Sequence, residues 1–135
     1  MADAPATPQL YGITLFVHRL ERCLEFYRDV LGLPVHKQGS FGAEFFDHHP
    51  HLTVAPANHP NAAAMVGRET GLTIFIPQLL HRAGDFHARG VSFVQEPTKM
   101  GFGIMAMVKD PDGNVLALWD PEVPDDDEQP PEMVV

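Results

Sequence analysis

The clearest alternation of apolar and polar positions lies near the end of the chain. An apolar run ends at Val108, and a second runs from Val115 to Trp119. Between them, Asp110-Pro111-Asp112-Gly113-Asn114 predicts a turn, because proline fixes φ and glycine and asparagine tolerate positive φ. The pattern predicts a β-hairpin. The alternate faces of its second strand carry Val115, Ala117 and Trp119 on one side and Leu116 and Leu118 on the other. Both faces are apolar, so one should pack on helices and the other should line an enclosed space.

The same order of elements occurs twice. A strand over 11–17, a helix over 19–31 and strands near 35–37, 42–46 and 51–55 form the first set. A strand over 71–76, a helix over 78–89, a strand over 91–94 and the hairpin form the second. Gly12 and Gly71, 59 residues apart, open the two sets, and a period seen twice indicates a pseudo-symmetric pair rather than a solenoid. The expected fold is α+β, with two tandem βαβββ modules whose cupped mixed sheets enclose a cleft.

The boundaries follow from composition. We expect a disordered N-terminal segment over 1–9, a first module over 10–56, a linker over 57–70, a second module over 71–121, and an acidic, proline-rich tail over 122–135. Deleting residues 122–135 should leave the fold intact.

Charge and cysteine content narrow the functional classes. The 135 residues carry a net charge of −9, and seven of the 18 acidic residues lie from Asp120 onward. The absence of clustered lysine and arginine argues against nucleic acid as a partner. No apolar run reaches the ~20 residues of a membrane span, and the start of the chain does not resemble a signal peptide. The lone Cys23 fits a reducing cytosol, so a cytoplasmic location is expected.

Two motifs resemble a known family. Residues 20–33, Leu-Glu-Arg-Cys-Leu-Glu-Phe-Tyr-Arg-Asp-Val-Leu-Gly-Leu, resemble the first-helix signature of the vicinal oxygen chelate superfamily, which includes glyoxalase I, bleomycin resistance proteins and extradiol dioxygenases. Residues 110–114 resemble the family's penultimate hairpin, and the resemblance covers about residues 10–121. It implies two βαβββ modules with cupped sheets, often paired in a homodimer, and a homodimer is therefore expected here.

The resemblance also implies where a metal would bind. Metal-using members take His, Glu or Gln ligands from the first and last strands of each module, and those positions fall here at Gly12, near Thr53, at Gly71 and at Ala117. Glycine and alanine have no donor atom, and threonine alone is a poor ligand. We therefore expect a metal-free cleft and no cofactor.

The expected ligand site follows from strand alternation. Aromatic walls and a few hydroxyls suit a planar ligand. The candidate ligand-binding residues are Thr14, Phe16, His51, Thr53, Thr73, Phe75, Val115, Ala117 and Trp119. Phe16 and Phe75 are as readily interpreted as core, whereas Trp119, at a strand end, favours binding.

The histidines and one glutamate remain to be placed. His48 and His49 read as exposed turn residues, and His51 as either exposed or a hydrogen-bond partner of the ligand. Glu44 is expected to be exposed, although a buried carboxylate there could act as an acid or base.

These residues leave several functions open. The favoured one is a metal-free, bleomycin-resistance-like protein that sequesters an aromatic or apolar small molecule, such as an antibiotic or metabolite, and is not an enzyme. The alternatives are a metal-dependent lyase or dioxygenase that recruits His51, a metal-free isomerase with His51 or Glu44 as base, and a scaffold subunit. No catalytic residue is assigned.

Overall fold

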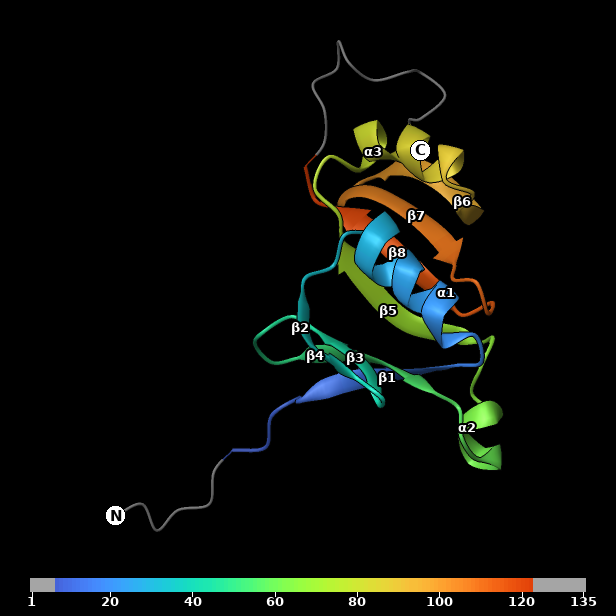
Figure 1. Cartoon of the computed structure of the whole chain (residues 1–135). Coiled ribbons are helices and arrows are strands. Elements are labelled where there is room, and N and C mark those ends of the chain that lie inside the picture. The colour runs from blue at the N-terminus through green and yellow to red at the C-terminus, as the bar shows by residue number, and fades with distance from the viewer. Residues whose placement is uncertain (1–6, 123–135) are drawn as a thin grey trace.

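The computed structural model describes residues 7–122. It contains two four-stranded sheets, one from each half of the chain (Figure 1). The strand orders are β1-β4-β3-β2 and β5-β8-β7-β6. In each sheet the first strand runs parallel to the last, and the other pairs are antiparallel. The two halves therefore share one connectivity, which confirms the predicted tandem βαβββ arrangement.

The elements follow each other as the hydrophobic pattern predicts. The first half contains β1 (Gly12–Val17), α1 (Leu20–Leu24), its π-helical continuation η1 (Glu25–Val30), β2 (Val35–Gly39), β3 (Gly42–Phe45) and β4 (His51–Pro56). The second half contains α2 (Pro60–Ala63), β5 (Glu69–Phe75), α3 (Leu79–Ala88), β6 (Ser92–Met100), β7 (Gly103–Lys109) and β8 (Val115–Asp120).

Two elements extend beyond their predicted bounds. Strand β5 begins at Glu69, inside the predicted linker, which also contains α2. Strand β6 continues to Met100 although Pro97 interrupts its pattern. Proline lacks an N–H and is tolerated on an edge strand, and β6 is the edge of its sheet, with register shifts around Gln95. Residues 1–6 and 123–135, which hold most of the predicted N-terminal segment and acidic tail, lie outside the described residues.

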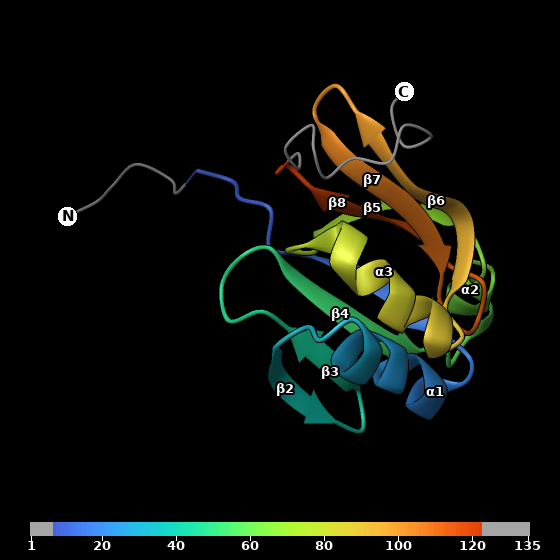
Figure 2. The same ribbon diagram turned by 90° about the horizontal axis from the view of Figure 1, so that it is seen from above.

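One apolar core joins the two halves. Leu15 and Val17 of β1 are buried, as are Leu116 and Leu118 of β8, and all four belong to one cluster that also contains helix residues such as Phe86. Helix α3 lies beside the end of the first helix, where Arg82 Nη2 donates to the Leu31 carbonyl at 3.2 Å (Figure 2). The buried faces of the strands therefore pack toward the helices, and the other face of each sheet is turned away from them. Strand β2 is the exception, because all of its residues are exposed.

The hairpin loop at 110–114 connects the halves through polar contacts. The Asp112 carboxylate accepts hydrogen bonds from the backbone N–H groups of His18 (2.6 Å) and Arg19 (2.8 Å) and from Arg19 Nε (2.8 Å). The Tyr27 hydroxyl donates to Asp110 Oδ2 at 2.8 Å. The start of the first helix is thereby attached to the second module.

These contacts also shift the pKa values of Asp112, Cys23 and Tyr27. Burial raises the pKa of Asp112, but the hydrogen bonds from Arg19 and His18 more than offset it and lower that pKa to about 2. Burial, together with the charge of Asp110, raises the pKa of the Cys23 thiol and of the Tyr27 hydroxyl. Neither group is therefore available as a nucleophile at neutral pH.

Candidate functional site

The predicted ligand residues lie on the faces of the two sheets that are turned away from the helices, which we call the open faces. In β8, Leu116 and Leu118 are buried, whereas Val115, Ala117 and Trp119 on the alternate face are only partly buried. In β1, Thr14 is exposed and Phe16 partly buried, while Leu15 and Val17 are in the core. Strand alternation therefore assigned these side chains to the correct faces.

The first sheet holds four of the predicted ligand-binding residues, namely Thr14, Phe16, His51 and Thr53. Parallel pairing sets Gly12 beside His51 and Thr14 beside Thr53. Thr14 and Phe16 also line a cavity of about 200 Å³ whose other residues come from β1, the segment that leads into β5 and the start of β5. The additional lining residues are Ile13, Leu15, Met65, Arg68, Glu69 and Thr70.

The second sheet holds the other five predicted residues. Thr73 pairs with Ala117 and Phe75 with Trp119, while Met107 and Met105 pair with Ala117 and Trp119 from the other side. Phe75 is 55 % exposed. Aromatic and methionine side chains thus meet around Trp119 on the second open face, whereas Glu69 and Lys109 pair with Val115 at its other end. Methionine adapts its shape to different ligands.

The positions at which relatives would bind a metal carry no suitable donors. A Cβ on Gly12 would come 2.8 Å from the backbone oxygen of His51, so a larger side chain there requires the backbone to shift. Among residues 7–122, no group of three or more His, Cys, Asp or Glu side chains is arranged to hold a metal ion. Gly12, Gly71 and Ala117 therefore offer no side-chain donor to a metal ion.

A cluster of histidines surrounds Glu44 at one end of the first open face. His51 is 6 % and Glu44 9 % exposed, so the expectation that Glu44 is exposed is wrong, as is the exposed alternative for His51. The His36 and His51 rings stack with centroids 5.6 Å apart. Both rings lie beside the Glu44 carboxylate, with imidazole nitrogens 3.8 Å and 3.7 Å from its Oε2 atom. Because these residues come from three different strands, a pattern read along one strand cannot show the burial.

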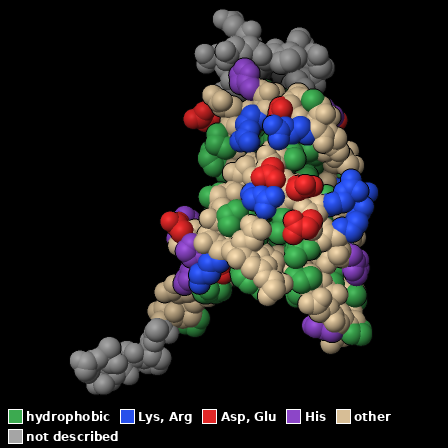
Figure 3. Space-filling view, in the orientation of Figure 1, with side chains coloured by type: hydrophobic (Ala, Val, Ile, Leu, Met, Phe, Trp, Pro, Cys, Tyr) green, Lys and Arg blue, Asp and Glu red, His purple; other side chains and the backbone are tan. Residues whose placement is uncertain are grey.

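His48 and His49 match their predicted exposure. His48 and His49 are exposed in the loop between β3 and β4, over which histidine side chains gather in Figure 3. The rings of Tyr11 and His49 lie 4.6 Å apart, and those of Tyr11 and His51 5.0 Å apart. Tyr11 was not a predicted site residue, because it precedes the first strand and its pairing depends on the returning β3–β4 loop.

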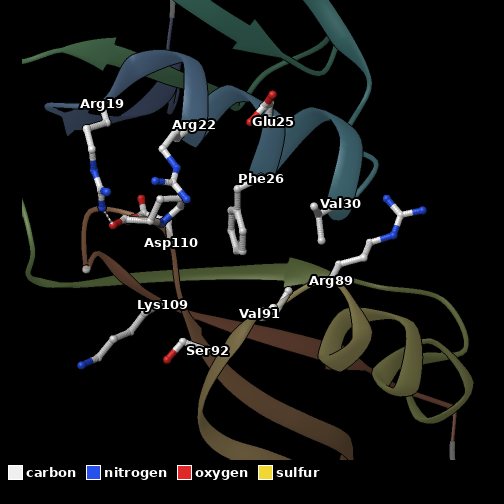
Figure 4. Close-up of a pocket in the computed structure, with 13 residues that line it drawn as sticks. Arg19, Arg22, Glu25, Phe26, Val30, Arg89, Val91, Ser92, Lys109 and Asp110 are labelled. Atoms are coloured by element: carbon white, nitrogen blue, oxygen red, sulfur yellow. Dashed lines mark hydrogen bonds between the residues drawn. The ribbon is translucent and has the colours of Figure 1, made fainter.

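A second cavity, of about 470 Å³, lies on the helix side of the molecule (Figure 4). Phe26 and Val30 point into it from the first helix, and Val91 lies opposite. Arg22 and Asp110 lie at one end and Arg89 at the other. Sequence reasoning missed this groove because its walls come from the first helix, the end of α3 and the hairpin loop, which only the fold brings together.

Comparison with known proteins identifies the family to which this fold belongs. The model of the Glyoxalase/Bleomycin resistance protein/Dioxygenase superfamily matches residues 10–118. No protein of curated function matches the chain. No helix among residues 7–122 is both long enough and apolar enough to cross a membrane.

Several solved structures have the same architecture at low sequence identity. UcmS2 is 20 % identical with a TM-score of 0.69, and the match covers 84 % of this chain and 98 % of that one. TnmS3, an antibiotic binding protein from Streptomyces sp. CB03234, is 22 % identical with a TM-score of 0.65 and coverages of 88 % and 100 %. A superfamily member from Sphaerobacter thermophilus DSM 20745 is 19 % identical with a TM-score of 0.69 and coverages of 84 % and 98 %.

Proposed function

Because this chain belongs to the glyoxalase/bleomycin resistance protein/dioxygenase superfamily, we propose that it is a metal-free member that binds an aromatic or largely apolar small molecule on its open sheet faces. The observation that carries the proposal is the composition of those faces. Glycine and alanine occupy the positions where relatives hold metal ligands, and aromatic side chains such as Phe75 and Trp119 lie beside them. The structural similarity to TnmS3, an antibiotic binding protein, supports an antibiotic or a related metabolite as the ligand.

The exposure of the second open face supports a binding role over a purely structural one. Phe75 is 55 % exposed and pairs with the partly buried Trp119. Exposed apolar groups that cluster on one face commonly mark a surface that binds a ligand or a partner. A planar molecule stacked on these rings would remove that surface from water.

We also propose that the chain acts as a cytoplasmic homodimer. Both sheets end in edge strands, β2 and β5 among them, and the open faces of a single chain belong to different sheets. A second copy that brings its open face toward the first would enclose a ligand from both sides. Analytical ultracentrifugation at micromolar concentration checks this expectation, and a strictly monomeric profile would contradict it.

A thermal-shift screen of natural-product antibiotics and aromatic metabolites tests the proposed function. A ligand that binds only the folded chain raises stability by about 2.7 kcal/mol at a concentration 100-fold above Kd. Hits are then checked for Trp119 emission, which reports on the second open face because Trp119 is the only tryptophan. A screen without any hit, or hits that leave the Trp119 emission unchanged, would count against a ligand at this position.

Elemental analysis of protein purified without chelator tests the metal-free state. We expect substoichiometric Zn, Fe, Mn and Ni. One equivalent of any of these metals would favour the lyase or dioxygenase alternative instead.

A further inference from the structure

The Glu44 side chain is buried without the partners that a buried carboxylate normally has. The residue is 9 % exposed, and its Oε2 atom is buried and accepts no hydrogen bond from any of the described residues. The nearest imidazole nitrogens, His51 Nδ1 at 3.7 Å and His36 Nε2 at 3.8 Å, are too distant to donate. Buried polar atoms are nearly always hydrogen-bonded in folded proteins, so an unpartnered carboxylate oxygen requires an explanation.

The donor nearest to Glu44 Oε2 is already used by another acceptor. His51 Nδ1 lies 2.8 Å from the backbone oxygen of Phe46. A carbonyl oxygen only accepts, so the Nδ1 hydrogen of His51 is directed to Phe46 and not to Glu44. The His36 ring stacks on His51 at an interplanar angle of 10°, and the Tyr11 ring lies 5.0 Å from His51. The nearest donor to Glu44 is therefore engaged elsewhere, and aromatic rings surround the carboxylate.

The cluster lies on the proposed ligand surface. Glu44 pairs with Thr53 across β3 and β4, and Thr53 pairs with Thr14 across β4 and β1, so the three residues form one row on the first open face. The Glu44 side chain retains 12 % of its exposure and that of His36 retains 33 %, so the cluster lies at the surface of this face. Lys37, the cross-strand partner of Glu44, is exposed and forms no ion pair with it among the described residues.

We propose that Glu44, flanked by His36 and His51, is the polar anchor of the ligand site, and that the ligand is an aromatic amine whose protonated nitrogen donates to the Glu44 carboxylate. This inference rests on the proposed function and specifies the class of ligand. An ammonium group supplies the donors that Glu44 Oε2 lacks, and it forms a charge-assisted hydrogen bond with the carboxylate. The stacked imidazoles and Tyr11 provide ring faces toward which a cation is attracted. The net charge of −9 favours the approach of a cation over an anion.

The test compares two probes that differ only in the donor group, 2-naphthylmethylamine and 2-naphthylmethanol, by calorimetry at pH 7. The wild type should bind the amine roughly 10- to 100-fold more tightly than the alcohol, the range expected for hydrogen bonds to a charged group. In Glu44→Gln the two affinities should become equal. Glu21→Gln is the matched control, since it removes an exposed glutamate on the first helix and should leave the preference unchanged.

Each outcome separates this inference from the proposed function. Equal affinities in the wild type, or a preference for the amine that survives in Glu44→Gln, would overturn the anchor and leave the proposed function standing. Absence of binding by both probes, together with an empty ligand screen, would overturn both. Melting curves establish that Glu44→Gln is folded, and His36→Gln gives an independent readout, because loss of the flanking ring should reduce the preference several-fold.

Discussion

The protein buries carboxylates in two regions, and they differ in whether the carboxylate oxygens are hydrogen-bonded within the chain. At the hairpin junction, Asp110 is 4 % exposed and accepts hydrogen bonds from the Tyr27 hydroxyl, the Asn114 side-chain amide and the backbone N–H groups of Asp112 and Asn114. On the first open face, Glu44 is nearly as buried, but its Oε2 has no partner among the described residues.

The difference separates groups that hold the fold together from groups that are available to a ligand. A carboxylate whose oxygens are satisfied within the chain stabilises the structure and has little capacity left for another molecule. A carboxylate without a partner destabilises the free protein and can gain most from binding a donor. The family-like Asp110–Asn114 motif thus belongs to the structural region of this chain, whereas the proposed ligand anchor lies in the other module.

The largest effect is expected at the hairpin junction. Asp110→Ala leaves several buried donors without an acceptor and should lower the free energy of unfolding by about 3–4 kcal/mol. Tyr27→Phe removes one of those contacts and should lower it by about 1–2 kcal/mol. Urea denaturation measures both, and equal losses in the two variants would show that the other contacts of Asp110 contribute little.

On the open face, substitutions should change affinity more than stability. Trp119 pairs with Phe75 and is only partly buried, with its Nε1 donating to the Phe102 carbonyl at 3.3 Å. For a ligand found in the screen, Trp119→Ala should weaken binding by roughly 1–3 kcal/mol through the loss of a stacked ring and its buried area. Calorimetry and melting curves on the same variant show whether Trp119 contributes mainly to ligand affinity or to stability. Unchanged affinity with a much lower Tm would assign Trp119 to the core.

Acid should selectively weaken the hairpin junction. The pKa of Asp112 is lowered from 3.8 to about 2, so its contribution to stability is complete above about pH 4 and is lost as the pH falls toward 2. At pH 7, Asp112→Asn should lower the free energy of unfolding by about 1–2 kcal/mol. The wild-type and variant stabilities should converge between pH 4 and pH 2, and parallel pH profiles would contradict the assignment.

The smallest expected effect has the opposite sign. In the absence of ligand, Glu44→Gln removes a buried, unpartnered charge and should raise the free energy of unfolding by about 1 kcal/mol. The exposed control Glu21→Gln should change it by less than about 0.5 kcal/mol. Chemical denaturation of both variants provides the measurement, and a clear loss of stability in Glu44→Gln would mean that the carboxylate has a structural partner after all.

The two modules and the orientation of their strands could be predicted from local patterns. Alternation along Val115–Trp119 assigns each side chain to a face because successive residues of a strand point to opposite sides. The turn at Asp110–Asn114 follows from proline and glycine, and Gly113 adopts the expected positive φ of 88°. The same local reasoning failed at Pro97, because only the strand order shows that β6 is an edge.

The sequence by itself determined the fold class, the two repeats, the faces of the strands and the lack of donors at Gly12, Gly71 and Ala117, since these depend on residue type and on short-range periodicity. Only the tertiary structure decided which polar groups find partners. Asp112 reaches the first helix across more than 90 residues of sequence, and Glu44 is covered by His36 and His51 from two other strands. Such burial depends on the register and packing of distant segments, which one strand's own pattern does not encode.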